Sequence, residues 1–160
     1  MQETTDSRGL KILLNAAPLS GVLSGVGRYA RSTYESILEQ QLADVSYFCN
    51  GKLLREMPQQ SAASSGAGLP WQLREALREI RLRYIQGQLQ RICRDKAPDI
   101  YHETGLVPLI TKTGVPTVMT IYDLSLVKFS HCHPVDRVRM FERHFYCRIE
   151  AVSHFITISD

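Results

Sequence analysis

Short apolar and β-branched runs alternate with longer helical patterns along this chain, and this alternation limits the fold more than any other feature. The runs typical of buried strands are 10–15 (LKILLN), 45–49 (VSYFC), 100–102 (IYH), 117–122 (TVMTIY) and 155–158 (FITI). Strands that alternate with helices form parallel sheets covered on both sides. The sequence therefore predicts an α/β fold, a Rossmann-like doubly wound parallel sheet with helices on both faces.

Three segments carry apolar residues at the three- and four-residue steps of a helix. The first has Val26, Tyr29, Ala30, Thr33, Tyr34, Ile37, Leu38 and Leu42 on one expected buried face. The second, 71–96, has Leu73, Leu77, Ile80, Tyr84, Ile85, Leu89 and Ile92, all expected on one side. The third, 134–151, has Val138, Phe141, Phe145 and Ile149.

The breaker-rich segment 58–70 (PQQSAASSGAGLP) predicts a mobile surface loop. It is too short to separate two domains, so residues 1–160 are expected to form one domain. The final Ser159-Asp160 is typical of a strand followed by a helix N-cap, which suggests a fragment cut before its next helix.

Composition excludes several classes of protein. The net charge of +3 is too small to argue for nucleic acid as a partner. No apolar run is long enough to span a membrane, and the polar N-terminus does not resemble a signal peptide. Four cysteines without C-x-x-C spacing fit a cytoplasmic protein with reduced thiols.

The string Gly25-Val26-Gly27-Arg28-Tyr29-Ala30 matches a G-x-G-x-x-A dinucleotide motif, but its context argues against a nicotinamide or flavin site. A long loop separates it from the first strand, and no carboxylate ends the second strand. A glycine loop at a helix start can still bind another anion, such as the diphosphate of a nucleotide sugar. The alternative is that the glycines only permit close packing of helix and sheet.

Three stretches together resemble one family. They are SGVGRYARSTYESILEQ, then PDIYHETGLVPL with GVPTVMTIYDLSLVKFSHCHPVDRVRMFERHF, and last AVSHFITISD. In this order they resemble the N-terminal domain of family 4 (group 1) glycosyltransferases of the GT-B fold. The likeness is greatest to bacterial mannosyl- and rhamnosyltransferase-like members that build cell-surface polysaccharide.

The resemblance implies a two-domain hexosyltransferase that needs no cofactor or metal and uses a nucleotide sugar as its donor substrate. This half would hold a saccharide or lipid-linked acceptor, and the absent C-terminal domain would hold the donor, so the fragment alone is expected to be inactive. Gly25 and Gly27 match the family's glycine loop near the donor diphosphate, with Arg28 and Tyr29 directly after it. Arg28 is either a phosphate clamp or an ordinary surface arginine.

Tyr122-Asp123-Leu124-Ser125 stands where the family usually has His-Asp-Leu-Ser. Tyrosine donates a hydrogen bond but does not become a cation near neutral pH, so the departure puts a titrating role in doubt. Asp123 is a candidate to orient an acceptor hydroxyl or act as a base, with Tyr122 and Ser125 beside it. The alternative for Asp123 is an N-cap or an Asx-turn.

His102 and Glu103 follow an apolar pair at the end of a strand, where open α/β sheets bind ligands. We expect them to contact acceptor or sugar hydroxyls, with His102 a candidate catalytic residue. A histidine satisfied by backbone groups in a turn is the alternative.

Two further features have a functional and a plainer interpretation. His131, Cys132, His133, His144 and Cys147 match no standard zinc spacing, so we expect a histidine-bearing loop and no metal. The basic 71–96 helix is either a solvated charged face or, as the resemblance implies, a peripheral contact with the inner membrane. Rival functions are an NAD-dependent oxidoreductase or epimerase domain, and a stand-alone carbohydrate- or partner-binding module.

Overall fold

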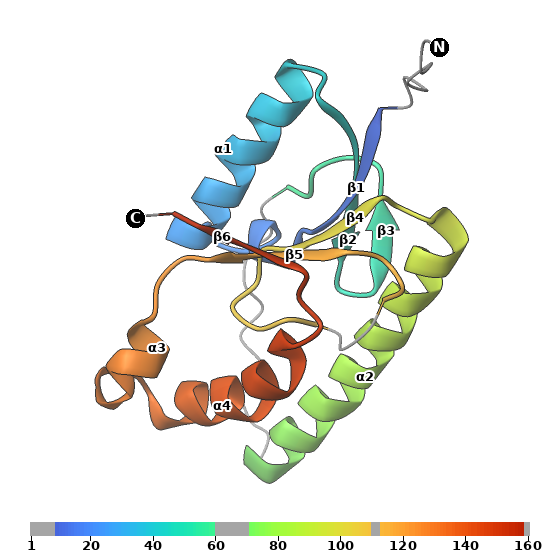
Figure 1. Ribbon diagram of the computed structural model, residues 1–160. Coiled ribbons are helices and arrows are strands. Elements are labelled where there is room, and N and C mark those ends of the chain that lie inside the picture. Colours follow the sequence, from blue (N-terminus) through green and yellow to red (C-terminus); the bar gives the residue numbers. More distant parts are fainter. Residues whose placement is uncertain (1–8, 60–70, 110–112, 159–160) are drawn as a thin grey trace, which may run out of the picture.

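The computed structural model describes residues 9–59, 71–109 and 113–158. In chain order the elements are β1 (Leu10–Asn15), η1 (Ala17–Leu19), α1 (Gly25–Glu39), β2 (Ala43–Cys49), β3 (Lys52–Leu54), α2 (Trp71–Lys96), β4 (Ile100–Glu103), β5 (Thr117–Ile121), α3 (Ser125–Lys128), η2 (Ser130–Cys132), α4 (Val135–Ile149) and β6 (His154–Thr157). Figure 1 shows how these elements surround one sheet. The five predicted strands and three long helices are all present, with ends displaced by up to three residues.

The sheet has six strands in the order β3-β2-β1-β4-β5-β6. Every pairing is parallel except that of β3, which runs antiparallel to β2. The predicted Rossmann-like α/β fold is confirmed, but the sheet is mixed. Strand β3 was not predicted: it follows β2 through Asn50 and Gly51, both at positive φ, as a tight hairpin requires.

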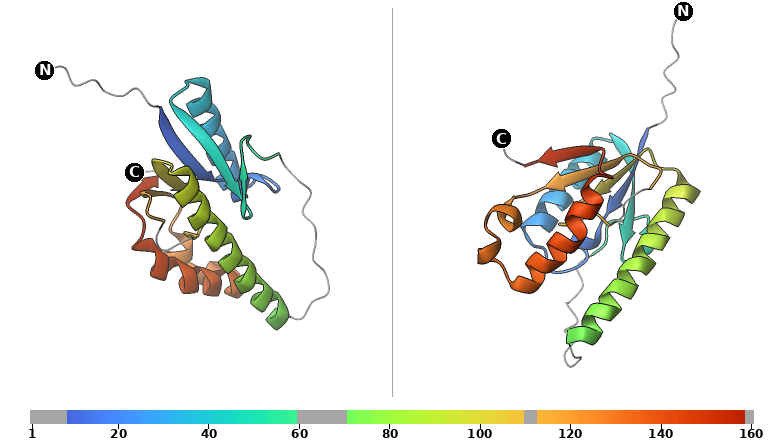
Figure 2. Two further views of the ribbon diagram at one scale, coloured as in Figure 1. Left: turned by 90° about the vertical axis from the view of Figure 1, so that its right-hand side faces the viewer. Right: turned by 60° about the horizontal axis from the view of Figure 1, so that its bottom comes forward.

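Helices cover both faces of the sheet, as predicted (Figure 2). On one face Leu14 and Tyr47 pack with Tyr34 of α1. On the other face Leu13 and Phe48 pack with Leu89 of α2. Because side chains alternate along a strand, neighbouring residues of β1 enter opposite halves of the core.

Helix α4 lies beside α2 on that second face (Figure 1). Its Phe141 and Phe145 pack against Met119 of β5, as the helical spacing predicts. The two rings stack with centroids 4.4 Å apart. These contacts fix the position of α4 beneath the end of β5.

The prediction that α2 has a single apolar side was wrong. Leu89 and Cys93 in its second half are buried against the sheet. The residues that form what we call the outer stripe, Leu73, Leu77, Ile80 and Tyr84, are between 47% and 65% exposed. At about 100° per residue the two sets lie roughly half a turn apart. The first half of α2 also extends beyond the sheet (Figure 2).

Helix α1 ends earlier than predicted, at Glu39 instead of residue 42. Gln41 adopts a positive φ of 54°, and the N–H of Leu42 donates to the carbonyl of Ile37. This is the Schellman arrangement that terminates helices. Leu38 and Leu42 are consequently exposed, contrary to the expected buried face.

Most of the predicted loop 58–70 and the final Ser159-Asp160 lie outside the described residues. At the start of the former, the carbonyl of Pro58 accepts a hydrogen bond from Arg31. Among the described residues no helix combines the length and the hydropathy needed to cross a membrane.

Candidate functional site

The candidate site is the edge of the sheet at which the parallel strands end. Asn15 ends β1, Glu103 ends β4, and Tyr122 and Asp123 follow β5. The connections diverge between the neighbouring strands β1 and β4, which is the point where open α/β sheets bind ligands. The start of α1 lies at this edge too, because Tyr29 meets Tyr122 edge to face with ring centroids 5.7 Å apart.

Glu103 is 0% exposed and accepts four hydrogen bonds at this edge. Oε1 accepts from Asn15 Nδ2 at 2.5 Å and from the Gly105 N–H at 2.7 Å. Oε2 accepts from the Tyr101 hydroxyl at 2.8 Å and from the Leu109 N–H at 3.0 Å. Burial raises the pKa of the Glu103 carboxyl above its usual range, and these hydrogen bonds oppose that rise. The arrangement favours a positioning role over the predicted direct contact with a sugar.

The loop after β4, residues 104–109, is held from several sides. Thr104 Oγ1 donates to the carbonyl of Asn15 at 2.6 Å. Gln86 of α2 donates to the Leu109 carbonyl at 2.6 Å. From α4, the buried Arg148 donates to the Pro108 carbonyl at 3.1 Å. The loop that borders the candidate site is therefore tied to β1, α2 and α4.

His102 points to the opposite face of the sheet, toward α1. Its Nδ1 is hydrogen-bonded to the Tyr34 hydroxyl at 2.5 Å, and its Nε2 to Thr120 Oγ1 at 2.8 Å. Burial lowers the pKa of His102 to about 4, so the ring is neutral at physiological pH. Both nitrogens are engaged by side chains inside the fold, which favours a structural histidine over the predicted catalytic one.

The Tyr122 side chain is half-buried, but its hydroxyl oxygen is fully covered and has no hydrogen-bond partner among the described residues. Burial first, and the nearby Tyr29 second, raise the pKa of this phenol well above its usual range. Tyr122 is therefore a neutral donor near neutral pH, as the sequence implied.

Asp123 is exposed and bound to Ser125. Its Oδ1 accepts from the Ser125 N–H at 2.8 Å and from Ser125 Oγ at 2.5 Å. These two hydrogen bonds are the main reason that the pKa of Asp123 lies below its usual value. The Asx-turn that was the alternative for Asp123 is present, and it leaves the exposed carboxylate ionised at this edge.

The start of α1 separates the two glycines of the G-x-G string. Ser24 is the N-cap, and its side chain accepts weakly from the Gly27 N–H at 3.5 Å. A Cβ on Gly27 would lie 2.7 Å from the Pro18 carbonyl oxygen, whereas a Cβ on Gly25 would meet nothing within 4 Å. Close packing therefore explains Gly27 but does not explain Gly25.

Arg28 follows in the first turn of α1 and is exposed. Its side chain makes no hydrogen bond or ion pair within the described part of the chain. Helix starts attract anions, and the guanidinium adds a positive charge there.

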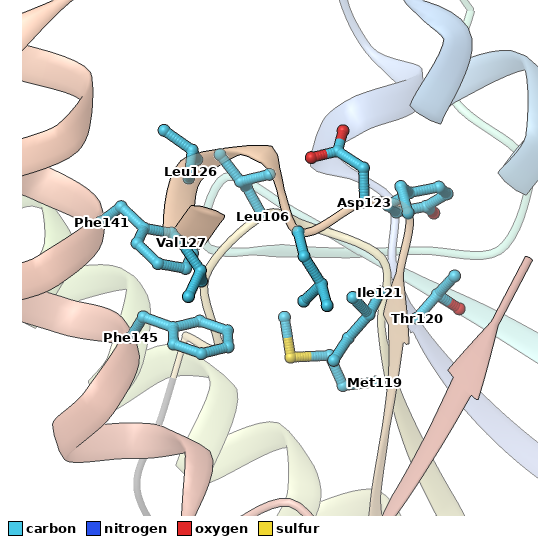
Figure 3. Close-up of a pocket in the computed structure, with 11 residues that line it drawn as sticks. Leu106, Met119, Thr120, Ile121, Asp123, Leu126, Val127, Phe141 and Phe145 are labelled. Carbon is cyan, nitrogen blue, oxygen red and sulfur yellow. The ribbon is translucent and has the colours of Figure 1, made fainter. Parts of the chain in front are cut away.

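An apolar pocket lies behind Asp123 (Figure 3). Its lining includes Leu106, Met119, Leu126, Phe141 and Phe145. The Asp123 carboxylate points away from the two phenylalanine rings (Figure 3). Apolar side chains from β5, α3 and α4 therefore pack directly behind the segment that carries Tyr122 and Asp123.

The histidine and cysteine cluster does not come together. His144 is hydrogen-bonded to Glu79 of α2 at 3.0 Å and to Arg148 at 3.0 Å, so it links two helices. His131 and Cys132 are exposed. In the described ranges no three His, Cys, Asp or Glu side chains gather in a way that would hold a metal ion.

Sequence reasoning missed the roles of Asn15, Tyr34 and His133. Asn15 bridges Glu103 and the Ala17 N–H, to which its Oδ1 is bound at 3.2 Å. His133 reaches Ser125 Oγ at 2.9 Å. Asn15 is the polar last residue of an apolar strand, a position that signals an edge residue. The partner of Tyr34, by contrast, depends on the register of distant strands.

No protein-family model matches this chain, and no solved structure matches it. Among curated proteins, the O-antigen chain mannosyltransferase B of Escherichia coli is 23% identical over an alignment 159 positions long that takes in 94% of this chain. The matched region is 41% of that relative, so this chain spans less than half of its length. The similarity supports a glycosyltransferase-like function in general terms.

Proposed function

We propose that this chain is the acceptor-binding part of a hexosyltransferase that moves mannose or a related sugar from a nucleotide sugar to a saccharide. The similarity to a mannosyltransferase over 94% of the chain carries this proposal. The exposed carboxylate of Asp123 supports it, because an ionised carboxylate accepts hydrogen bonds from sugar hydroxyls.

In this proposal the acceptor lies at the end of β5. The ionised Asp123 accepts a hydrogen bond from an acceptor hydroxyl and so orients its oxygen toward the donor sugar. The Tyr122 hydroxyl is covered in the structure, so a small movement of the ring would have to expose it before it donates to a second oxygen of either sugar. A fixed donor and a fixed acceptor select one orientation of the saccharide, which lowers the entropic cost of reaction.

The donor diphosphate is proposed to lie near the start of α1. Backbone N–H groups at Gly25 and the guanidinium of Arg28 would stabilise the negative charge that develops on the departing diphosphate. No metal or organic cofactor is needed for this chemistry. A C-terminal domain would supply the rest of the donor site, as in GT-B enzymes.

The Arg28 role has a matched control. Arg94 is exposed near the end of α2, which precedes β4 and so lies at the opposite edge of the sheet. Arg28→Ala should raise KM for the nucleotide sugar about tenfold, since it removes one charged contact. Arg94→Ala should leave KM unchanged, and equal effects of the two variants would contradict the assignment.

The test of the function is a transfer assay on protein expressed from its complete open reading frame. GDP- and UDP-sugars are offered with oligosaccharide and lipid-linked acceptors, and products are detected by mass spectrometry. Transfer or slow donor hydrolysis supports the proposal. If none of the donors is turned over and NAD raises the melting temperature, the dinucleotide-binding alternative is favoured.

We also propose that the protein contacts the inner membrane peripherally from the cytoplasm, through the outer stripe of α2. These apolar side chains are exposed, and the exposed Arg81 and Arg83 flank them on the two sides of the helix surface. Such a surface suits a bilayer that contains anionic lipid, where a lipid-linked acceptor would lie.

Co-sedimentation with vesicles tests this contact. Phosphatidylcholine vesicles with and without phosphatidylglycerol are compared, with Ile80→Gln as the disrupting variant. Leu38→Gln on α1 is the control, because Leu38 is another exposed apolar residue. Equal recruitment by both vesicle types, or equal losses in both variants, would contradict the proposal.

A further inference from the structure

A chain of hydrogen bonds leads from Asp123 through Ser125 to His133. Ser125 Oγ donates to Asp123 Oδ1 at 2.5 Å, and His133 Nε2 lies 2.9 Å from the same Ser125 Oγ. His133 comes from the segment between η2 and α4, so the chain joins the end of β5 to the start of α4. The proposed function uses Asp123 but gives no role to His133.

The direction of these hydrogen bonds follows from the chemistry of the three groups. An ionised carboxylate can only accept, so the single hydroxyl proton of Ser125 is committed to Asp123. Ser125 Oγ then has lone pairs only for His133, which must donate through Nε2–H. The contact therefore fixes which nitrogen of His133 carries a proton, whether the ring is neutral or charged.

The two oxygens of Asp123 have different surroundings. Oδ1 accepts from both the N–H and the hydroxyl of Ser125. Oδ2 has no hydrogen-bond partner among the residues that the structure describes, and the side chain is exposed. His133 and Arg137 are the positively charged or chargeable groups that act on this carboxylate.

We propose that His133 is a positioning residue: through the Ser125 hydroxyl it holds Oδ1 of Asp123, so that Oδ2 is presented to a hydroxyl of the sugar acceptor. The inference rests on the proposed function for the identity of the ligand. It goes beyond that function because it assigns the orientation of Asp123 to a residue on a different element. His133 itself does not touch the acceptor.

The alternative is that His133 merely closes the loop between α3 and α4. A structural role of this kind would change stability without changing the electrostatics of Asp123. The two roles are therefore separated by a property of Asp123 that is measured without any substrate, its carboxyl pKa.

The experiment compares four variants with the wild type in carbon-detected NMR titrations. His133→Leu and Ser125→Ala should move the pKa of Asp123 upward, toward the ordinary value of about 3.9. His133→Gln keeps an N–H donor at a similar reach and should restore most of the difference. His131→Leu is the control, because His131 is exposed and its ring contacts Phe129 instead, with centroids 6.5 Å apart.

The same variants are then tested for binding of methyl α-D-mannopyranoside, used as the acceptor probe. His133→Leu should weaken its binding about 3- to 10-fold, the effect of losing one ordered hydrogen bond. His131→Leu should bind as the wild type does. Melting temperatures show which variants remain folded, and His133→Ala replaces His133→Leu if the leucine variant does not fold.

An unchanged Asp123 pKa in His133→Leu, with a raised pKa in Ser125→Ala, would overturn the positioning role of His133. If His133→Leu changes the Asp123 pKa but the wild-type protein does not bind the mannoside, the hydrogen-bond chain is supported. That outcome would overturn the acceptor role of Asp123, and with it this part of the proposed function.

Discussion

The side chain of Asn15, at the end of β1, donates a 2.5 Å hydrogen bond to the buried carboxylate of Glu103, at the end of β4. The two residues end neighbouring strands at the point where the sheet's connections diverge. Glu103 also binds backbone N–H groups of the following loop at Gly105 and Leu109. This one pair therefore ties the centre of the sheet to the border of the candidate site.

Replacing Glu103 by glutamine should destabilise the fold. All four of its partners are donors, so the new NH2 group would face a donor in every orientation. We expect a loss of about 1–3 kcal/mol in the free energy of unfolding, measured by urea denaturation. Glu39→Gln, at an exposed position at the end of α1, is the control and should change it by less than about 0.5 kcal/mol. Equal losses of stability in the two variants would contradict the role of Glu103 in holding β1, β4 and the following loop together.

The two glycines of the G-x-G string should respond differently to alanine. In Gly27→Ala the new Cβ would overlap the Pro18 carbonyl oxygen and the Leu23 side chain, at 2.7 and 2.8 Å. We expect this variant to lose about 1–3 kcal/mol of stability, the cost of overpacking. Gly25→Ala meets open space and should be neutral or stabilising by less than about 1 kcal/mol. Thermal melts of both variants decide, and a harmless Gly27→Ala would refute the packing role.

His102 should make the fold sensitive to acid. Its pKa is about 4 when folded and about 6.5 when unfolded, so between these values the unfolded chain binds more protons. Stability contributed by His102 is complete above about pH 6.5 and falls by about 3 kcal/mol as the pH drops toward 4. His102→Gln does not titrate and should show a correspondingly flatter stability profile in urea titrations. If the unfolding free energies of variant and wild type depend on pH in the same way, the His102 ring is not held buried and neutral in the folded protein.

Tyr122 and Tyr34 provide a matched pair for separating binding from stability. Tyr34→Phe removes the hydrogen bond to His102 and should cost about 1–2 kcal/mol of stability. Tyr122→Phe removes a hydroxyl with no partner among the described residues, so stability should be retained or slightly raised. If this phenol binds sugar, Tyr122→Phe should lower transfer about tenfold while its melting temperature is unchanged. A full transfer rate would exclude the phenol from the site.

The strands and long helices were predictable because each carries a strong local pattern. Strand β1 has the predicted bounds, and α4 buries Phe141 and Phe145 as its spacing indicates. Strand β3 is only Lys52–Leu54 and too short for any periodicity, although the Asn50-Gly51 turn was a usable signal. In α2 the apolar residues of the first half and those of the second half lie on different sides of the helix. Listing them together as one pattern hides this difference.

The candidate site was predictable in place but not in detail. Polar residues after apolar strands marked the correct edge, since parallel strands end together. Whether a side chain faces the interior or the edge depends on strand register, which pairs His102 with Leu14 and turns it toward α1. The contact between His133 and Ser125 depends on the path of α3 and η2, two elements too short to read from the sequence.

The most direct test of the central claim is sugar transfer by the protein from its complete open reading frame, compared with its Asp123→Asn variant. We predict that the wild type transfers a hexose from a nucleotide sugar and that Asp123→Asn reduces kcat/KM about 10- to 100-fold with the fold intact. Absence of transfer from every donor would contradict the proposed function. Transfer at full rate by Asp123→Asn would contradict the assignment of the site.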